Sequence, residues 1–251
     1  MRTWRGVVQY DGTAYAGFQR QSSTPTIQGT LEEALRKVTQ EHTAVIGAGR
    51  TDARVHARGQ VVSFSSETRL EAPTLMRALN TTVPRDIVLS SLEEAERGFN
   101  ARYDARSRAY EYIVYNTALP SPFWTRYSHH VPDPLDTAGM SAALGRLVGE
   151  HDFAAFGMPM ERTRDGVTER GGTVRLVLGA HCRVRRPFVY FYIEANAFLR
   201  HMVRLIVGTV LRVGRGRLKP EDVRAILDAR HIAAAGPAAP AQGLYLVQVT
   251  Y

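Results

Sequence analysis

The stretch Gly47-Ala48-Gly49-Arg50-Thr51-Asp52-Ala53-Arg54-Val55-His56-Ala57-Arg58-Gly59-Gln60-Val61-Val62 sets one carboxylate, Asp52, among three arginines. It begins with a Gly-x-Gly turn and ends in a run typical of a strand. Arg50, Asp52, Arg54, His56 and Arg58 share one parity, so an extended backbone would point their side chains to the same side. Nearby positive charge favours the ionised form of a carboxylate. The pattern therefore predicts an ionised Asp52 in a cationic wall, which suits a nucleophile.

Three simpler interpretations of this stretch remain open. Glycine and aspartate are common in ordinary turns. The arginines could form a solvated face with one surface ion pair, worth about 0–1 kcal/mol. The stretch could also bind phosphate, but it lacks the Gly-Lys-Ser/Thr of a P-loop and the third glycine of a dinucleotide fingerprint.

The stretch resembles the signature Ala-Gly-Arg-Thr-Asp-x-Gly-Val-His-Ala-x-Gly-Gln-Val of the tRNA pseudouridine synthase I family. One position departs from it, since Arg54 stands where the family usually has glycine. A Cβ there restricts the backbone, so we expect the loop after Asp52 to run slightly differently. Other blocks agree in the family's order along almost the full length: Tyr10-Asp11-Gly12, Gly17-Phe18-Gln19-Arg20-Gln21, Phe99-Asn100-Ala101-Arg102, Arg108-Ala109-Tyr110-Glu111-Tyr112, Asn196-Ala197-Phe198-Leu199, His201-Met202-Val203-Arg204 and Gly243-Leu244-Tyr245-Leu246.

Hydrophobic periodicity predicts an α+β protein. Strands are expected over 4–10, 43–46, 60–65, 86–91, 108–116, 174–184, 188–195 and 244–251. Helices are expected over 26–39, from Pro73, over 135–148 and 197–213, and from Pro220; a charged, glycine-containing loop is expected over 162–172. The resemblance implies two α/β lobes whose antiparallel sheets meet at a central catalytic cleft. Residues 1–104 would carry the Asp52 loop, and 105–251 would carry Tyr110 and Arg204.

The predicted helix over 197–213 carries a polar stripe. Arg200, Arg204, Gly208 and Arg212 are spaced by four, so they share one face, and apolar residues fill the remaining surface. Such a stripe faces either water or a cleft that RNA occupies, and periodicity does not choose between them. The resemblance implies that Arg204 pairs with the catalytic Asp52.

Tyr110 is the third candidate element. Residues 108, 110, 112 and 114 share one face of a predicted strand, where tyrosine usually packs in the core. The resemblance instead implies that Tyr110 packs against the target base, and its hydroxyl could transfer a proton. Leu244 could form an apolar wall of the same pocket, although ordinary strand packing explains it equally simply.

The resemblance implies an isomerase that converts uridine to pseudouridine at tRNA positions 38–40, in the anticodon stem-loop. The base would flip out of the RNA and Asp52 would attack covalently, with no cofactor. Arg50 would fill the vacated position or contact phosphates. The resemblance also implies a homodimer, with one tRNA touching both subunits. Candidate phosphate contacts are Arg54, Arg58, Arg102, Arg106 and Arg200.

Composition agrees with a polyanionic partner. The chain has 251 residues, a net charge of +8 and a pI near 9.9. Only two of its 32 basic residues are lysines, which also fits a coding bias toward arginine. Cys182 is the only cysteine, so neither an intrachain disulfide nor a multi-cysteine zinc site can form, and no metal is expected. Without a long apolar run or signal-like start, the sequence predicts a soluble cytoplasmic protein.

Two other functions remain open. A non-catalytic RNA-binding protein would explain the charge, but a carboxylate among its cations would repel phosphate. A phosphate-handling enzyme that uses the Gly-x-Gly turn would bind nucleotides or need Mg²⁺.

Overall fold

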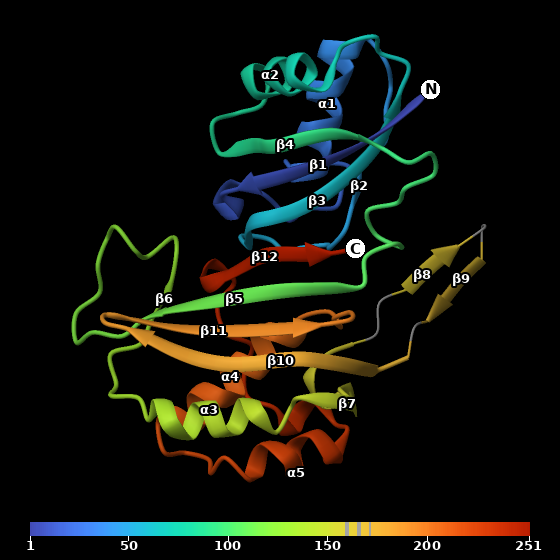
Figure 1. The fold of residues 1–251 in the computed structure, drawn as a ribbon. Helices are drawn as coiled ribbons and strands as arrows, with labels where there is room; N and C mark the ends of the chain where they lie inside the picture. The colour runs from blue at the N-terminus through green and yellow to red at the C-terminus, as the bar shows by residue number, and fades with distance from the viewer. Residues whose placement is uncertain (159–160, 165–166, 171) are drawn as a thin grey trace. The chain divides into compact units, whose positions relative to one another are not determined.

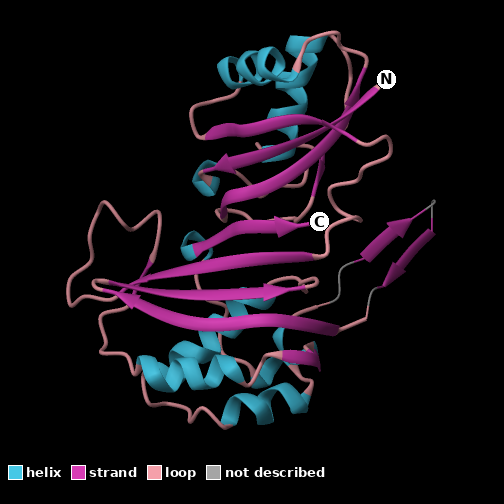
Figure 2. Ribbon diagram, in the orientation of Figure 1, coloured by secondary structure: helices cyan, strands magenta, loops and turns pink. Residues whose placement is uncertain are grey.

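The computed structural model describes residues 1–158, 161–164, 167–170 and 172–251. The chain forms two compact units, a first unit of Met1–Arg108 with Tyr245–Tyr251 and a second unit of Ala109–Leu244. Both are mixed α/β, as the sequence predicts (Figure 2). The division expected between residues 104 and 105 lies four residues earlier than the one observed. The C-terminal strand also joins the first unit, because it pairs with a strand of that unit.

The sheet of the first unit runs in the order β4, β1, β3, β12 (Figure 1). β1 is antiparallel to both of its neighbours, and β12 runs parallel to β3. The two-residue β2 pairs with β3 on the way into the Asp52 loop. The strands are β1 (Arg2–Tyr10), β2 (Ile46–Gly47), β3 (His56–Ser66), β4 (Ile87–Ala95) and β12 (Leu244–Thr250).

Helices α1 (Ile27–Thr39) and α2 (Ala72–Thr82) complete the first unit. α1 begins at Ile27 because the hydroxyl of Thr26 accepts a hydrogen bond from the Gly29 amide at 3.3 Å, which caps the helix. Pro73 stands in the first turn of α2, where a missing N–H costs nothing. The unit buries its apolar residues between these helices and the sheet, and Trp4 is fully buried.

The sheet of the second unit runs in the order β5, β11, β10, β7, and β6 pairs with β5. α3 packs on β10 and on α4. Alternate residues of β11 are buried, as in a strand with one covered face. The elements are β5 (Ser107–Tyr115), β6 (His129–His130), β7 (Gly149–Asp152), β10 (Val174–Arg185), β11 (Phe188–Ala195), α3 (Thr137–Gly145), α4 (Met202–Gly214) and α5 (Asp222–Ala229). Short 3₁₀ helices occupy Gly12–Ala14, Ala154–Phe156, Ile232–Ala234 and Ala241–Gly243.

Three local predictions are wrong. A strand over 43–46 is absent except at Ile46, where β2 starts. The segment 197–201 is not helical, since α4 begins at Met202 and His201 has a left-handed φ of 64°. In place of a loop over 162–172, strands β8 (Glu161–Arg164) and β9 (Val167–Arg170) pair antiparallel, while 165, 166 and 171 lie outside the described residues.

None of the helices in the described parts of the chain is long and apolar enough to cross a membrane.

Candidate active site

Asp52 lies in the loop between β2 and β3, which we call the Asp52 loop (residues 48–55). The loop is not extended, because the amide of Val55 donates to the carbonyl of Asp52 at 3.2 Å and closes a turn. Arg54, inside this turn, has φ 65°. The extended backbone that the parity argument assumes is therefore absent between Asp52 and Val55, so parity does not place Arg54 on the same side as Asp52. Asp52 is half-buried, whereas Arg54 is exposed.

Arg54 adopts the left-handed conformation that glycine adopts freely. For a residue with a Cβ, this conformation is less stable than the right-handed one by about 1–2 kcal/mol. A hydrogen bond from the amide of Arg54 to the carbonyl of Tyr15, at 3.3 Å, helps to hold this geometry. The backbone therefore takes a path that suits glycine even though arginine stands there.

Two buried side chains fix the first half of the Asp52 loop. The hydroxyl of Tyr10 lies 2.8 Å from that of Thr51, next to Asp52. Gln60 donates to the carbonyl of Gly49 at 2.6 Å and accepts from its amide at 3.2 Å. Burial raises the pKa of Tyr10 to about 12, against the effect of its hydrogen bonds with Thr51 and Gln60, which lower it. The tyrosine therefore stays neutral at ordinary pH.

Arg108 joins the Asp52 loop to the next turn of the same unit. Its guanidinium donates to the carbonyl of Ala48 at 3.1 and 3.2 Å, to that of Arg102 at 2.6 Å and to that of Ala105 at 3.0 Å. A single planar group thus holds two backbone segments in a fixed relation. Sequence reasoning did not select Arg108, although it lies in one of the quoted family-like blocks.

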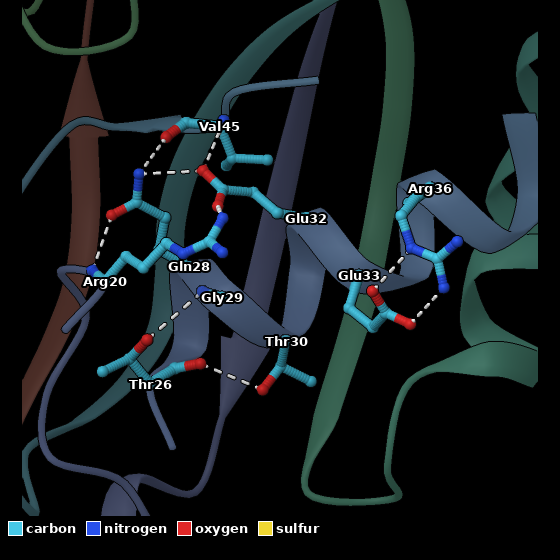
Figure 3. A network of polar contacts seen from close by, with 9 residues as sticks. All are labelled: Arg20, Thr26, Gln28, Gly29, Thr30, Glu32, Glu33, Arg36 and Val45. Carbon is cyan, nitrogen blue, oxygen red and sulfur yellow. Dashed lines mark hydrogen bonds and ion pairs between the residues drawn. The ribbon is translucent and has the colours of Figure 1, made fainter. Parts of the chain in front are cut away.

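Helix α1 fixes the chain where it approaches the loop (Figure 3). The amide side chain of Gln28 donates to the carbonyl of Val45 at 2.9 Å, and Glu32 accepts from the amide of Val45 at 3.2 Å. Two residues later, a Cβ on Gly47 would lie 2.4 Å from the ring of Phe18, so only glycine fits. The backbone thus enters the Asp52 loop along a path that side chains of α1 and Phe18 define.

The arginines of the first unit that were predicted to contact phosphate lie in different surroundings. The guanidinium of Arg58 lies 4.5 Å from the ring centre of Tyr245, which also stacks on buried His56 at 4.7 Å. Arg106 is exposed, and its amide donates to the carbonyl of Thr250 at 2.8 Å.

Arg50 and Arg102 lie close enough to influence each other. Partial burial lowers the pKa of Arg50, and the positive charge of Arg102 lowers it further. The structure thus brings these two predicted residues together.

The second unit holds the other candidates. Tyr110 on β5 is 8% exposed, and its ring meets that of Phe198 edge-on at 5.0 Å. Tyr112, on the same face, is fully buried as core packing predicts. Leu244 is 6% exposed, which fits ordinary strand packing as well as a pocket wall.

Arg204 lies in the first turn of α4, on the face that segment 236–240 covers. Its Nε donates to the carbonyl of Ala239 at 2.7 Å, and the amide of Ala239 donates back to the carbonyl of Arg204 at 2.9 Å. A Cβ on Gly208 would lie 1.9 Å from the carbonyl of Pro237. Part of the predicted stripe therefore packs on this segment, and Arg204 and Arg212 are half-buried.

Arg200 does not belong to that stripe. It precedes α4, is exposed, and forms an isolated antiparallel bridge with Met158, to whose carbonyl its amide donates at 3.0 Å. The left-handed turn at His201 separates it from the helix.

Within the described part of the chain, no group of three or more histidine, cysteine, aspartate or glutamate residues could hold a metal ion. The first unit thus offers one carboxylate on a fixed loop, several guanidinium groups and the buried Tyr10. Such a set can attack an electrophilic carbon and bind an anion.

The chain is similar to known proteins over most of its length. A family model described as tRNA pseudouridine synthase matches residues 7–104 and 143–251. The chain is 43% identical over 247 residues to a tRNA pseudouridine synthase A from Moorella thermoacetica, covering 96% of each. It is 40% identical to a protein of the same name from Thermoanaerobacter sp., with both chains covered completely. Among solved structures, it resembles one chain of a Cbf5-Nop10-Gar1 complex at 12% identity and a TM-score of 0.36, covering 97% of this chain and 48% of that one.

Proposed function

This chain belongs to the tRNA pseudouridine synthase family, a family of isomerases, and we propose that it converts uridine to pseudouridine in tRNA with Asp52 as nucleophile. The observation that carries the proposal is the position of Asp52. A half-buried carboxylate lies on a loop that Gln60 and Arg108 hold at the backbone of Gly49 and Ala48, and that Tyr10 holds at the hydroxyl of Thr51. Such preorganisation is what a nucleophile needs and what a surface turn does not need.

The proposed reaction needs no external reactant. The carboxylate of Asp52 bonds to C1′ of the ribose while the N-glycosidic bond breaks. The uracil then turns, C5 bonds to C1′, and the carboxylate leaves. The proton at C5 is lost and N1 gains one, so product and substrate have the same composition. Because nothing is oxidised or added, the proposal includes no cofactor.

Arg204 and Tyr110 have distinct proposed roles. Arg204 balances the charge of Asp52, because an unpaired carboxylate away from water would take up a proton. Tyr110 packs against the target base, and base–aromatic stacking is worth about 1–3 kcal/mol. Leu244 adds an apolar wall to the same pocket. A Tyr110→Phe variant separates stacking from proton transfer, since only the hydroxyl is lost.

The proposed substrate is the anticodon stem-loop of tRNA, at positions 38–40. Bases near the end of a stem cost less to extrude than bases in its middle, which suits a site that serves several adjacent uridines. Arg50 fills the vacated position or contacts phosphate. The other proposed phosphate contacts are Arg54, Arg58, Arg102, Arg106 and Arg200. We further propose that the protein acts as a homodimer in which one tRNA touches both subunits, which light scattering with and without tRNA tests.

Mapping of pseudouridine in an unmodified tRNA transcript tests the function. The wild-type protein should produce pseudouridine at positions 38–40, and Asp52→Ala should produce none while still binding the transcript. Asp133→Asn is a matched control, because it removes an exposed carboxylate that pairs with Arg215 in the second unit. Modification by the Asp52→Ala variant would contradict the proposal.

The same assay separates the two other functions. A non-catalytic RNA-binding protein would bind the transcript and leave every uridine unchanged. A phosphate-handling enzyme would lose activity in EDTA, whereas the proposed synthase keeps its full turnover there.

A further inference from the structure

Tyr103 is an exposed aromatic residue next to Arg102. It is 51% exposed, and the guanidinium of Arg102 lies 5.7 Å from its ring centre. A single exposed aromatic is ordinary on a protein surface. What distinguishes Tyr103 is the combination of a rigid backbone with two neighbouring cations.

The turn that carries Tyr103 is fixed by its own hydrogen bonds. The side-chain oxygen of Asn100 accepts from the amides of Arg102 at 3.0 Å and Tyr103 at 3.2 Å. The amide of Asn100 in turn donates to Asp104 at 2.8 Å. The backbone beneath the Tyr103 ring is thus held before any ligand arrives, which lowers the entropy lost on binding.

The sheet anchors the same turn at Ala101, which is fully buried. The amide of Ala101 donates to the hydroxyl of Ser63 at 3.0 Å, and its carbonyl accepts from the hydroxyl of Tyr251 at 2.8 Å. These contacts tie the turn to β3 and to the last residue of the chain.

The guanidinium of Arg102 adjoins the ring, and Arg50 lies near enough to interact electrostatically with both residues. Partial burial lowers the pKa of Arg50, the charge of Arg102 lowers it further, and Tyr103 raises it. Holding two like charges together costs free energy, which an anion placed between them would recover. Arg108 fixes the backbone of both segments through its bonds to Ala48 and Arg102.

We propose that Arg50, Arg102 and Tyr103 form one binding site for a nucleotide of the RNA other than the reacting uridine. The two guanidinium groups hold its phosphate, and its base stacks on the ring of Tyr103. An aromatic platform accepts any base, because every base has a π-face. This site rests on the proposed function, because its ligand is part of the proposed RNA substrate. It adds Tyr103, which the sequence did not single out.

Fluorescence anisotropy with a labelled, unmodified tRNA transcript tests the site at several KCl concentrations. Tyr103→Ala should weaken binding roughly 5- to 150-fold, the loss expected for one stacked base. Tyr103→Phe should bind as the wild type does, because it keeps the ring. Neither variant should change the dependence of affinity on salt.

Arg102→Gln supplies the complementary measurement. It should weaken binding and reduce the slope of log affinity against log salt by about 0.7–0.9, the value for one phosphate contact. Phe123→Ala is the matched control, because it removes an 81% exposed ring from the second unit and should leave affinity unchanged.

The outcomes separate this inference from the proposed function. If the wild-type protein forms pseudouridine and Tyr103→Ala binds as tightly as the wild type, the nucleotide site is wrong and the function stands. Equal losses for Tyr103→Phe and Tyr103→Ala would also overturn stacking, since the hydroxyl would then matter. If the wild-type protein forms no pseudouridine, the function fails, whatever the affinities are.

Discussion

The Asp52 loop and helix α4 each carry a charge of the proposed mechanism, but they are held in place in opposite ways. Eleven of the thirteen residues of α4 are buried, and the two others are Arg204 and Arg212. The helix is thus fixed by apolar surface that its own sequence period predicts. The Asp52 loop is fixed by hydrogen bonds with the side chains of Tyr10, Gln60 and Arg108, which lie outside it in the sequence.

The two regions should therefore respond differently to substitution. Loss of one apolar group in a helix with many apolar contacts lowers stability by a limited amount and leaves the backbone in place. Loss of one hydrogen-bonding side chain beneath a loop leaves buried backbone groups unsatisfied, so the loop itself moves.

The largest effects are expected at two glycines where backbones nearly touch. A Cβ on Gly12 would lie 2.0 Å from the carbonyl of Val55 in the Asp52 loop, and one on Gly208 would lie 1.9 Å from that of Pro237. Alanine at either position should lower the free energy of unfolding by about 3 kcal/mol or more. Gly12→Ala should also abolish pseudouridine formation in protein that remains folded, while Gly208→Ala should reduce it less.

Gly145→Ala is the control for this pair. A Cβ at Gly145, the last residue of α3, would meet no atom within 4 Å. Urea unfolding should therefore show unchanged or slightly higher stability. A larger loss of activity from Gly208→Ala than from Gly12→Ala, at equal folded fraction, would reverse the contrast.

Arg108→Met should have the next largest effect. It leaves the carbonyls of Ala48, Arg102 and Ala105 without this donor, so we expect a loss of about 2–3 kcal/mol in unfolding free energy. The rate of pseudouridine formation at saturating tRNA should fall, and Arg108→Lys should restore only part of it.

Arg2→Met tests whether loss of any arginine in this unit has that effect. Arg2 donates to the carbonyl of Leu70 and pairs with exposed Glu94. Its removal should lower the free energy of unfolding much less than Arg108→Met does and should leave the rate unchanged, since exposed ion pairs contribute little. Equal rates for Arg108→Met and Arg2→Met would contradict a positioning role for Arg108.

pH should act on the two units in opposite directions. Burial, followed by the charges of Arg215 and His130, lowers the pKa of His129 from 6.5 to about 4. The folded protein thus resists protonation of His129, so its stabilising contribution is complete above pH 6.5 and is lost as pH falls toward 4. Burial raises the pKa of Tyr10 from 10 to about 12, so its contribution is complete below pH 10 and is lost as pH rises toward 12.

Each pH effect should amount to about 1–2 kcal/mol, measured by urea unfolding at pH 5 and at pH 11.5 relative to pH 8. His129→Gln should flatten only the acid side of the profile, and Tyr10→Phe only part of the alkaline side. An acid loss that His129→Gln leaves unchanged would rule out this histidine as its source.

Arg54→Gly should have the smallest effect on stability and a mixed effect on function. Glycine removes the strain of φ 65°, so the free energy of unfolding should rise by up to about 1 kcal/mol. Binding of the tRNA transcript should weaken and depend less on salt, since one cation is lost. Lower stability together with tighter binding would contradict both parts.

The α+β class, most strands and helices, and the family can all be predicted from local patterns in the sequence. Periodicity predicts α1 and β11 because their apolar faces are local patterns, and an ordered set of short motifs identifies the family. Four features exist only in the folded chain: the left-handed turn at Arg54, the start of α4 at Met202, the contacts of Tyr10, Gln60 and Arg108 with the Asp52 loop, and the position of β12 in the first unit. These features depend on hydrogen bonds and close backbone contacts between residues far apart in the chain. A local pattern carries no record of such contacts.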